Sequence, residues 1–279
     1  MLAAPGADTP GTESQPSMTV TILMPMAGRG SRFAREGQVL PKPLVPVFGV
    51  PMFRLALASV RRTLPNARLV CIVLAEHDAK FQLAGALRQA DPKAEIVTIA
   101  QPTGGTMETC LAAESAIAPG SLIILDCDLT FASAAYDAHL RDLEAGRYPA
   151  DGMLLSFRSN GPQFSYAELA GDRVIRTAEK QVISDRALIG SYGFSDAARF
   201  FGLAHDIVDR MQLSGNGEYY VSSAYNRLIE TGGVVQLRDV DRYWSVGTPE
   251  ELRTATNDPA FQIHLRDLGL IAPNGTPLP

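Results

Sequence analysis

The sequence predicts an α/β protein with a Rossmann-like, mixed but mainly parallel central sheet that is flanked by helices. Apolar, β-branched runs at 20–23, 68–74, 95–99 and 121–125 alternate with stretches of helical periodicity. Strands and helices that alternate at this spacing are typical of βαβ units, whose strands pair in parallel. With 46% hydrophobic and 20% charged residues, the 279-residue chain can bury the core that such a sheet requires.

The first half of the chain supplies the parallel strands. Its expected elements are, in chain order, the strand 20–23, a helix at 51–60, the strand 68–74, a helix at 77–89, the strand 95–99, a helix from 106 to about 117, and the strand 121–125. Thr106 is expected to cap the helix that it precedes. Because ligands bind at the carboxyl ends of strands in such sheets, Gln101, Asp126 and Asp128 are expected to share one crevice with the turn after the first strand.

The second half has shorter strands, joined by turns. We expect strands at 152–157, 166–169, 173–176, 187–194 and 234–237, and helices at 197–211 and 222–230. Gly171-Asp172 is a hairpin-type turn between two of these strands. Thr248-Pro-Glu-Glu251 is a capping-box pattern, so a helix should begin at Pro249. No linker-like stretch separates the halves, and we expect them to share one sheet.

Composition limits the classes of function. The net charge of −5 gives no general nucleic-acid footprint, and no apolar run is long enough to span a membrane. Cys71, Cys110 and Cys127 lie in apolar runs without metal-ligand spacing, which indicates packing in a reduced, cytoplasmic setting. Residues 1–17 are rich in Ala, Pro, Gly, Ser and Thr and lack the features of a secretory signal, so a disordered tail is expected there.

The turn after the first strand has the features of a polyphosphate site. Met24-Pro-Met-Ala-Gly-Arg-Gly-Ser-Arg-Phe33 is followed closely by Leu40-Pro-Lys-Pro-Leu-Val-Pro-Val47. Glycines allow a backbone to approach a ligand, and successive N–H groups in such a turn attract anions. Arg29, Arg32 and Lys42 add positive charge where a polyphosphate would lie. The third glycine of a dinucleotide fingerprint is missing, and no P-loop pattern is present, so nucleoside triphosphate binding of another type is predicted.

Ala27-Gly-Arg-Gly-Ser-Arg32 and Pro41-Lys-Pro43 resemble the entry signature of the sugar-phosphate nucleotidyltransferases, or pyrophosphorylases. The resemblance covers residues 18 to about 256. It implies a GT-A-like fold and the transfer of a nucleoside monophosphate from an NTP to a phosphorylated small-molecule acceptor, most readily a sugar 1-phosphate, with release of pyrophosphate. It also implies one domain over 18–279, with an NTP-binding half at 18–150, an acceptor-binding half at 151–256 and a C-terminal extension at 257–279.

The resemblance also assigns roles at the nucleotide side. Arg32 is similar to the side chain that holds the β- and γ-phosphates, and Lys42 to the cation beside the α-phosphate. Cations there would offset repulsion between two phosphates during in-line attack. The other nucleotide-binding positions that it implies are Ala27, Gly28, Gly30, Ser31, Gln101, Gly105 and Asp126.

Asp128 resembles the residue that binds Mg²⁺ in this family, and magnesium favours carboxylate oxygens together with phosphate and water. Two Asp residues two positions apart point to opposite faces of an extended strand, so both can serve one metal only if the chain bends. Tyr243-Trp-Ser-Val-Gly-Thr248 departs from the family pattern, because Ser245 stands where a second acidic ligand is common. Either one metal is held mainly by Asp128 and the substrates, or Asp239 or Asp241 takes the place, or activity is reduced.

Four residues resemble the acceptor side of the family's site. Glu179-Lys180 is similar to an E-K pair whose lysine holds the acceptor phosphate. Gly190 matches a glycine that lies close to the acceptor, and Glu218 matches an acidic residue that contacts it. Phosphorylated acceptors other than sugars, such as phosphocholine, stay open.

Two other classes of function are weighed against this one. Asp126-Cys-Asp128 is formally a D-x-D pattern, with which GT-A glycosyltransferases hold a nucleotide-sugar through a metal. The loss of an acidic residue at Ser245 is compatible with a non-catalytic paralogue that senses a nucleotide or sugar phosphate. The sequence leaves open which nucleobase is bound and which oligomeric state the protein has. A homo-oligomer is one of the states considered.

Overall fold

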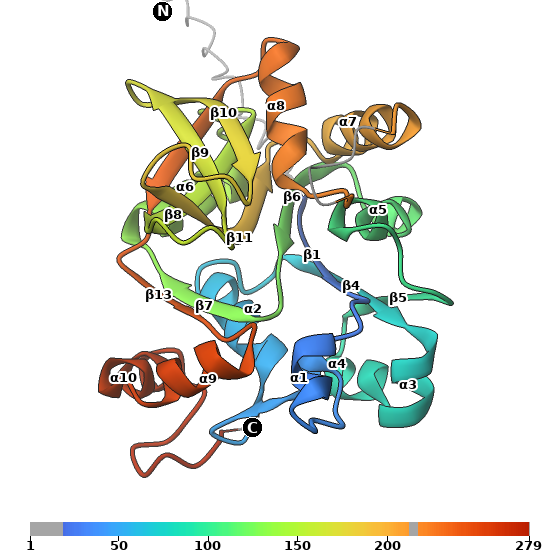
Figure 1. The fold of residues 1–279 in the computed structure, drawn as a ribbon, viewed down its shortest axis with the longest axis vertical. Helices are drawn as coiled ribbons and strands as arrows, with labels where there is room; N and C mark the ends of the chain where they lie inside the picture. Colours follow the sequence, from blue (N-terminus) through green and yellow to red (C-terminus); the bar gives the residue numbers. More distant parts are fainter. Residues whose placement is uncertain (1–18, 212–216, 279) are drawn as a thin grey trace, which may run out of the picture.

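The computed structural model describes residues 19–211 and 217–278, and it is organised around one nine-stranded sheet (Figure 1). The strand order is β5-β4-β1-β6-β11-β8-β12-β10-β9. The strands are β1 (Thr19–Met26), β4 (Arg68–Leu74), β5 (Glu95–Ile99), β6 (Gly120–Leu125), β8 (Gly152–Arg158), β9 (Ser165–Ala170), β10 (Arg173–Glu179), β11 (Arg186–Phe194) and β12 (Val235–Asp239). The tail expected at 1–17 lies outside the described residues.

The direction of pairing changes halfway across the sheet. Strands β5, β4, β1 and β6 pair in parallel, as the sequence predicts. Strand β11 then runs antiparallel to both β6 and β8, while β8 and β12 pair in parallel. Strands β9 and β10 form an antiparallel hairpin around Gly171-Asp172, which confirms the predicted turn. The α/β class with a mixed sheet is confirmed, and strands from both halves lie in the one sheet.

Helices cover the two faces of this sheet. One buried cluster joins one face to α5 (Thr106–Leu111), α7 (Ala197–Asp209) and α8 (Ser222–Glu230), and a second joins the other face to α2 (Met52–Arg61), α4 (Leu83–Ala90) and α6 (Ala134–Glu144). Leu122 and Ile124 of β6 belong to the first cluster, whereas Ile123 and Leu125 belong to the second. This alternation explains why the run is apolar throughout, because a strand that is buried on both faces has no solvent side.

A third cluster of buried hydrophobic residues packs the segment after the glycine turn against the last helices of the chain. It joins Phe33 of α1 (Ser31–Arg35) and the small sheet of β2 (Pro46–Val47) and β3 (Val50–Pro51) to α9 (Pro249–Thr256) and α10 (Pro259–Asp267). A further two-stranded sheet pairs β7 (Leu129–Ala132) with β13 (Arg242–Ser245). These contacts place the loop around Lys42 next to the strand that follows Asp128.

Two helix predictions were wrong in detail. The helix expected at 77–89 is two helices, α3 (Ala75–Phe81) and α4, because Gln82 has the left-handed conformation with φ of 54° and the carboxylate of Asp78 accepts the N–H of Ala84. The helix expected at 106–117 ends at Leu111 and is followed by a short 3₁₀ helix, Glu114–Ala116. Thr106 does not cap it, since the N-cap is Gly105. By contrast, Thr248 caps α9 as predicted, by accepting the N–H of Glu251 at 3.1 Å.

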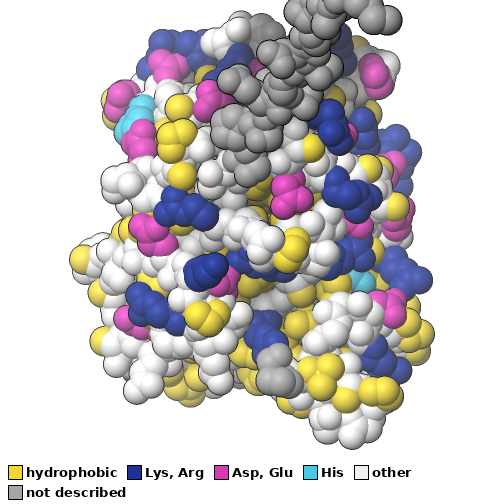
Figure 2. Space-filling view, turned by 180° about the vertical axis from the view of Figure 1, so that it is seen from behind, with side chains coloured by type: hydrophobic (Ala, Val, Ile, Leu, Met, Phe, Trp, Pro, Cys, Tyr) yellow, Lys and Arg dark blue, Asp and Glu magenta, His cyan; other side chains and the backbone are white. Residues whose placement is uncertain are grey.

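The surface is mixed in charge. Figure 2 shows basic and acidic side chains interspersed over the rear face of the molecule. Within 19–211 and 217–278, no helix is long and apolar enough to cross a membrane. The three cysteines are free and buried, as expected for packing residues.

Acid is expected to destabilise the fold through buried His264. Its Nε2 lies 2.9 Å from Thr130 Oγ1, and burial lowers its pKa to about 4. The unfolded chain takes up this proton near pH 6.5, so stability is lost as pH falls from about 6.5 to about 4, by about 1.4 kcal/mol per pH unit. Urea unfolding of wild type and His264→Gln between pH 7 and 4.5 measures how much His264 contributes to the pH dependence of the free energy of unfolding. Equal pH slopes for the two proteins would show that His264 is not buried in its neutral form.

Candidate active site

Two adjoining cavities open at the carboxyl ends of the parallel strands. The first, here called the glycine-loop cavity, has a volume of about 460 Å³ and is lined by the residues after β1, β5 and β6 together with Lys42. The second, the inner cavity, has a volume of about 210 Å³ and is lined mainly by residues of the second half. Both are lined by Thr106, Asp126 and Asp128, which therefore form a shared wall. Two substrates bound in the two cavities would meet at this wall.

The glycine turn forms one side of the first cavity. Strand β1 ends at Met26, and Ala27, Gly28 and Gly30 line the cavity. Gly30 has φ of 61°, a left-handed conformation that glycine adopts without strain and that allows α1 to begin at once. Ser31, the first residue of α1, is exposed and does not line either cavity.

Arg32 faces a different space from the one that the sequence indicates. It is exposed on α1, and it lines the inner cavity instead of the glycine-loop cavity. The expected role for Arg32, holding the distal phosphates of an NTP, stays a prediction.

Lys42 and Asp128 form an ion pair at the shared wall. Lys42 Nζ donates to Asp128 Oδ2, and the two side chains are 25% and 24% exposed. Pro41 and Pro43 on either side restrict the backbone of Lys42, which begins a short 3₁₀ helix. Burial alone would lower the pKa of Lys42, but the nearby acidic groups, Asp128 foremost, raise it above the ordinary value. Lys42 is therefore a fixed positive charge at neutral pH.

The chain bends after β6, so both carboxylates of Asp126-Cys-Asp128 reach the shared wall. The N–H of Asp126 donates to Gly190 O at 2.9 Å, which ties this bend to β11. Gly190 has φ of 79°, and a Cβ there would overlap the carboxylate of Asp126. Burial, and then repulsion from Asp128, raises the pKa of Asp126 to about 8. Glycine at position 190 thus leaves the room in which an unusually basic carboxylate sits.

The acidic pair fits a hard divalent cation. Asp126 and Asp128 lie on the same wall, where a cation that binds between them would offset the repulsion between their carboxylates, and oxygen ligands suit Mg²⁺. In the part of the chain that the structure describes, no group of three or more acidic, His or Cys side chains is arranged for a metal. A magnesium ion here would therefore depend on phosphate and water for its other ligands, as is common for that ion.

Ser245 lies beside Asp128, as the altered motif predicts. It ends β13 opposite Leu129 and lines the inner cavity, and the next residue, Val246, donates its N–H to Asp128 O at 2.9 Å. A Cβ at Gly247 would overlap the Asp128 carboxylate. The backbone of the motif thus packs closely against Asp128, although the side chain at 245 contributes a hydroxyl group.

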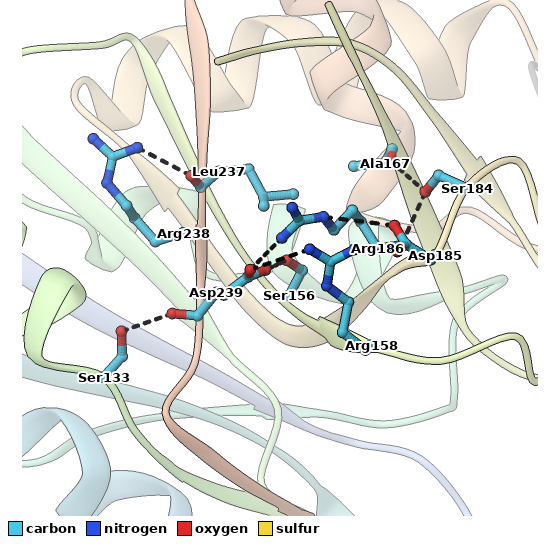
Figure 3. Close-up of polar contacts among 10 residues, drawn as sticks. All are labelled: Ser133, Ser156, Arg158, Ala167, Ser184, Asp185, Arg186, Leu237, Arg238 and Asp239. Atoms are coloured by element: carbon cyan, nitrogen blue, oxygen red, sulfur yellow. Dashed lines mark hydrogen bonds and ion pairs between the residues drawn. The ribbon is translucent and has the colours of Figure 1, made fainter. Parts of the chain in front are cut away.

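The two aspartates considered as substitutes for that position are held elsewhere. Asp239 is bound by Arg186, Arg158 and Ser156, whose Oγ lies 2.7 Å from Asp239 Oδ1 (Figure 3). Asp241 Oδ2 accepts the N–H of Ala134 at 2.8 Å, at the start of α6. Neither residue lines the two cavities. Replacement of the missing ligand by Asp239 or Asp241 is therefore not what the structure shows.

The predicted acceptor residues separate into two groups. Glu179 and Gly190 line the inner cavity, where Glu179 accepts hydrogen bonds from Ser165 and Ser222 and burial raises its pKa. Lys180 lines neither cavity; it is exposed, and its Nζ donates to Tyr220 Oη at 2.7 Å.

Glu218 lies on the other side of the shared wall from its expected ligand. Its carboxylate accepts from Tyr220 Oη, and the residue lines the glycine-loop cavity, although the sequence assigns it to the acceptor. The acceptor roles of Glu218 and Lys180 stay predictions.

The loop after β5 forms another side of the glycine-loop cavity. Gln101 itself is exposed and lines neither cavity, whereas 102–106 directly after it line the glycine-loop cavity. This loop is bound to the segment that carries Tyr219, because Met107 N donates to Tyr219 O at 3.0 Å and Tyr219 N donates to Gly104 O at 3.1 Å. Gly105 passes so close that a Cβ would overlap the backbone of Tyr219.

Comparison with known proteins identifies the family to which the chain belongs. Residues 22–187 match the MobA-like NTP transferase domain, which is more than half of the chain and includes the glycine turn, Lys42 and the acidic pair. The chain belongs to this family. The resemblance to nucleotidyltransferases, and with it the enzyme class, is confirmed.

Relatives of this NTP transferase include two curated proteins. A glucose-1-phosphate thymidylyltransferase of Streptomyces antibioticus is 33% identical over 117 residues, 41% of this chain, and the match spans 31% of that protein's length. The low-salt glycan biosynthesis nucleotidyltransferase Agl11 of Haloferax volcanii is 24% identical over 255 residues, 89% of this chain and 68% of its own.

Solved structures agree on the fold of the NTP transferase. A nucleoside-diphosphate-sugar pyrophosphorylase of Vibrio cholerae superposes with a TM-score of 0.71 at 26% identity, covering 84% of this chain and 98% of that one. A UDP-glucose pyrophosphorylase superposes with a TM-score of 0.67 at 16% identity, covering 86% and 98%, which shows a shared fold.

Sequence reasoning missed several residues that line the cavities of this NTP transferase. Tyr192 lies in the strand expected at 187–194, and Tyr243 is the first residue of the altered motif at 243–248; neither has a predicted role in the site, yet both line the inner cavity. Glu251 was assigned only to the cap of α9, and its side chain also lines that cavity. The retained Gly247-Thr248 was the signal that could have led to Tyr243 and Glu251, because both lie within a few residues of it.

Proposed function

We propose that this NTP transferase moves a nucleoside monophosphate from an NTP to a phosphorylated small-molecule acceptor and releases pyrophosphate. The observation that carries the proposal is the shared wall, where Asp126 and Asp128 line both cavities and Lys42 pairs with Asp128. The triphosphate occupies the glycine-loop cavity beside Gly28 and Gly30. The acceptor occupies the inner cavity, with its phosphate directed at the wall. A sugar 1-phosphate is the first acceptor to consider, since the relatives are named for sugar nucleotides.

The charges at the wall suit in-line attack of one phosphate on another. The acceptor oxygen must approach a phosphorus atom that is surrounded by negative oxygens, so the barrier falls where fixed positive charge lies beside the α-phosphate. Lys42 supplies such a charge and is kept in place by Asp128 and by the prolines on either side. Mg²⁺, held by Asp128 with Asp126 and the phosphates, would neutralise charge that develops on the phosphate oxygens.

The proposal also assigns a role to each segment of the chain and a cellular setting to the protein. Residues 18–150 bind the NTP, 151–256 hold the acceptor, and 257–279 support the loop around Lys42 through the cluster that includes Phe261. The three reduced, buried cysteines support a cytoplasmic setting.

The test is a matrix of NTPs and phosphorylated acceptors, with Mg²⁺ and with detection of pyrophosphate. We expect release only when one NTP and one acceptor are both present. Asp128→Asn should lower the rate about 100- to 1000-fold, because it removes the carboxylate that would hold Mg²⁺ and that pairs with Lys42 beside the reacting phosphates. Asp209→Asn, an exposed aspartate at the end of α7, is the matched control and should keep the full rate.

Other outcomes would select the competing functions. Absence of pyrophosphate with every pair, in a protein that unfolds cooperatively, would overturn the proposal. If NTP binding then stabilised the protein without turnover, the sensing function that Ser245 suggests would be favoured. Transfer of sugar from a nucleotide-sugar would favour the glycosyltransferase function of the D-x-D pattern.

A further inference from the structure

The inner cavity has more negative charge than a phosphorylated acceptor needs. Asp126, Asp128, Glu179 and Glu251 line it, and Arg32 is the cation among its lining residues in the described part of the chain. The two aspartates lie on the shared wall beside the reacting phosphates. Glu179 and Glu251 line the inner cavity but not the glycine-loop cavity, so they lie on the side away from the NTP.

Glu251 departs from the structural role that its position suggests. In a capping box the glutamate side chain returns to the N–H of the capping residue. Here only the other half is formed, with the N–H of Glu251 donating to Thr248 Oγ1. Within 19–211 and 217–278, the carboxylate of Glu251 has no ion-pair partner and accepts no hydrogen bond, and it lines the inner cavity.

Aromatic rings accompany these two glutamates. Phe164, Tyr192, Tyr220 and Tyr243 line the inner cavity. Beyond them lies a third cavity of about 560 Å³, here called the aromatic cavity. The residues that it shares with the inner cavity are Arg32, Gln163, Phe164, Tyr243, Ser245 and Glu251. The ring of Phe157 packs against two of the shared rings, with centroids 5.0 Å from Phe164 and 4.5 Å from Tyr243. Carboxylates beside aromatic faces favour an organic cation, because both attract positive charge.

We propose that the acceptor carries an ammonium group in addition to its phosphate, and that Glu251, Glu179 and the rings of Phe164 and Tyr243 hold this group. This inference rests on the proposed function, because it assumes that the phosphate of the acceptor meets the shared wall. The ligand class is a monophosphate ester with a quaternary or primary ammonium group at its far end. Arg32 is one positive charge among the lining residues, against the four carboxylates of Asp126, Asp128, Glu179 and Glu251, so an ammonium group on the acceptor would reduce the excess negative charge of the inner cavity.

Binding measurements test the charge of the acceptor without requiring turnover. The two probes are phosphocholine and 3,3-dimethylbutyl phosphate. The second is an isostere of the first in which carbon replaces the ammonium nitrogen, so it keeps the phosphate and lacks the positive charge. Each is titrated calorimetrically into the protein with Mg²⁺ and each of several non-hydrolysable NTP analogues. We expect phosphocholine, or phosphoethanolamine as the primary-ammonium probe, to bind at least about tenfold more tightly than the isostere. Glucose 1-phosphate, which is neutral apart from its phosphate, should bind as weakly as the isostere.

Glu251→Gln tests the residue itself. The variant keeps the backbone N–H that donates to the capping Thr248 and removes only the charge of the side chain. The preference for the ammonium acceptor over the isostere should therefore fall to about twofold or less. The Kd of the NTP analogue should be unchanged. Glu144→Gln, at the exposed end of α6, makes the same change of charge away from the cavities and should keep the full preference.

The outcomes separate this inference from the proposed function. Preferential binding of the ammonium acceptor without pyrophosphate release would support the inference and overturn the function. Equal binding of acceptor and isostere, or tighter binding and faster turnover of glucose 1-phosphate, would overturn the inference and leave the function in place. A preference that survives Glu251→Gln would also overturn it as stated.

Discussion

Replacing Lys42 with methionine is expected to lower the kcat for pyrophosphate release about 100- to 1000-fold, the usual cost of removing one preorganised charge from a transition state. Methionine retains most of the length and apolar contact of the lysine stem, so the loss reports the ammonium group. Without it, Asp128 and Asp126 remain as uncompensated negative charge on the wall where two phosphates must meet. Single-turnover kinetics at saturating substrates measure the effect directly.

The matched control is Lys80→Met on α3, where the lysine is exposed and lies over the ring of Phe81. It makes the same chemical change away from the cavities and should keep the wild-type rate. A Lys42→Met protein that retained more than about a tenth of that rate would contradict the proposed role, because a loss so small is less than one such charge contributes.

Replacing Gly105 with alanine is expected to weaken NTP binding about tenfold or more and to lower the free energy of unfolding by about 1–3 kcal/mol. Gly105 has φ of 155°, and a Cβ would overlap the backbone of Tyr219, which cannot move aside as a side chain can. The loop and the segment with Tyr219 would separate, breaking the hydrogen bonds from Met107 N and to Gly104 O. Both flank the glycine-loop cavity, so its shape would change.

Gly104→Ala is the control for this prediction. A Cβ at Gly104 would meet the carboxylate of Glu108, which is the mobile end of a side chain, and would lie 3.6 Å from the ring of Tyr219. NTP affinity and urea stability should therefore stay close to wild type for Gly104→Ala. Indistinguishable affinities for the two alanine variants would show that the contact of Gly105 with Tyr219 does not shape the nucleotide site.

The parallel half of the fold was predictable because β1, β4 and β6 are buried on both faces and the edge strand β5 is rich in β-branched residues. After a charged first residue, the runs 68–74 and 95–99 are apolar or β-branched, and the structure has β4 and β5 with these same bounds. The break at Gln82 could not be foreseen, because the residue gives no local signal for a left-handed conformation and the cause is the capture of Ala84 N–H by Asp78. Periodicity reports which face is buried and says little about such local competition.

The site was predictable where it follows the chain locally, and less so where it depends on distant contacts. Ala27, Gly28, Gly30, Lys42 and Asp128 line the glycine-loop cavity as the motif predicts. Lys180 and Gln101 were chosen from short matches, and the structure leaves both exposed and outside the cavities. Which cavity Arg32, Glu218 and Glu251 face is set by the packing of α1, α9 and the segment near Tyr219, and no motif of a few residues encodes that.

The reversal of strand direction between β6 and β11 also has an evolutionary consequence. The glycine-loop cavity lies at the carboxyl ends of the parallel strands, while the inner cavity is built largely on the antiparallel strands and on α9. The antiparallel pairing of β6 with β11 joins the two parts, and the hydrogen bond from Asp126 N to Gly190 O extends this pairing to the shared wall. Under the proposed function, substitutions among the inner-cavity residues of the second half would change which acceptor binds and leave the residues of the glycine-loop cavity unaltered. In an enzyme of this proposed kind, acceptor choice would then evolve by single substitutions on one side of the sheet, while NTP binding is retained on the other.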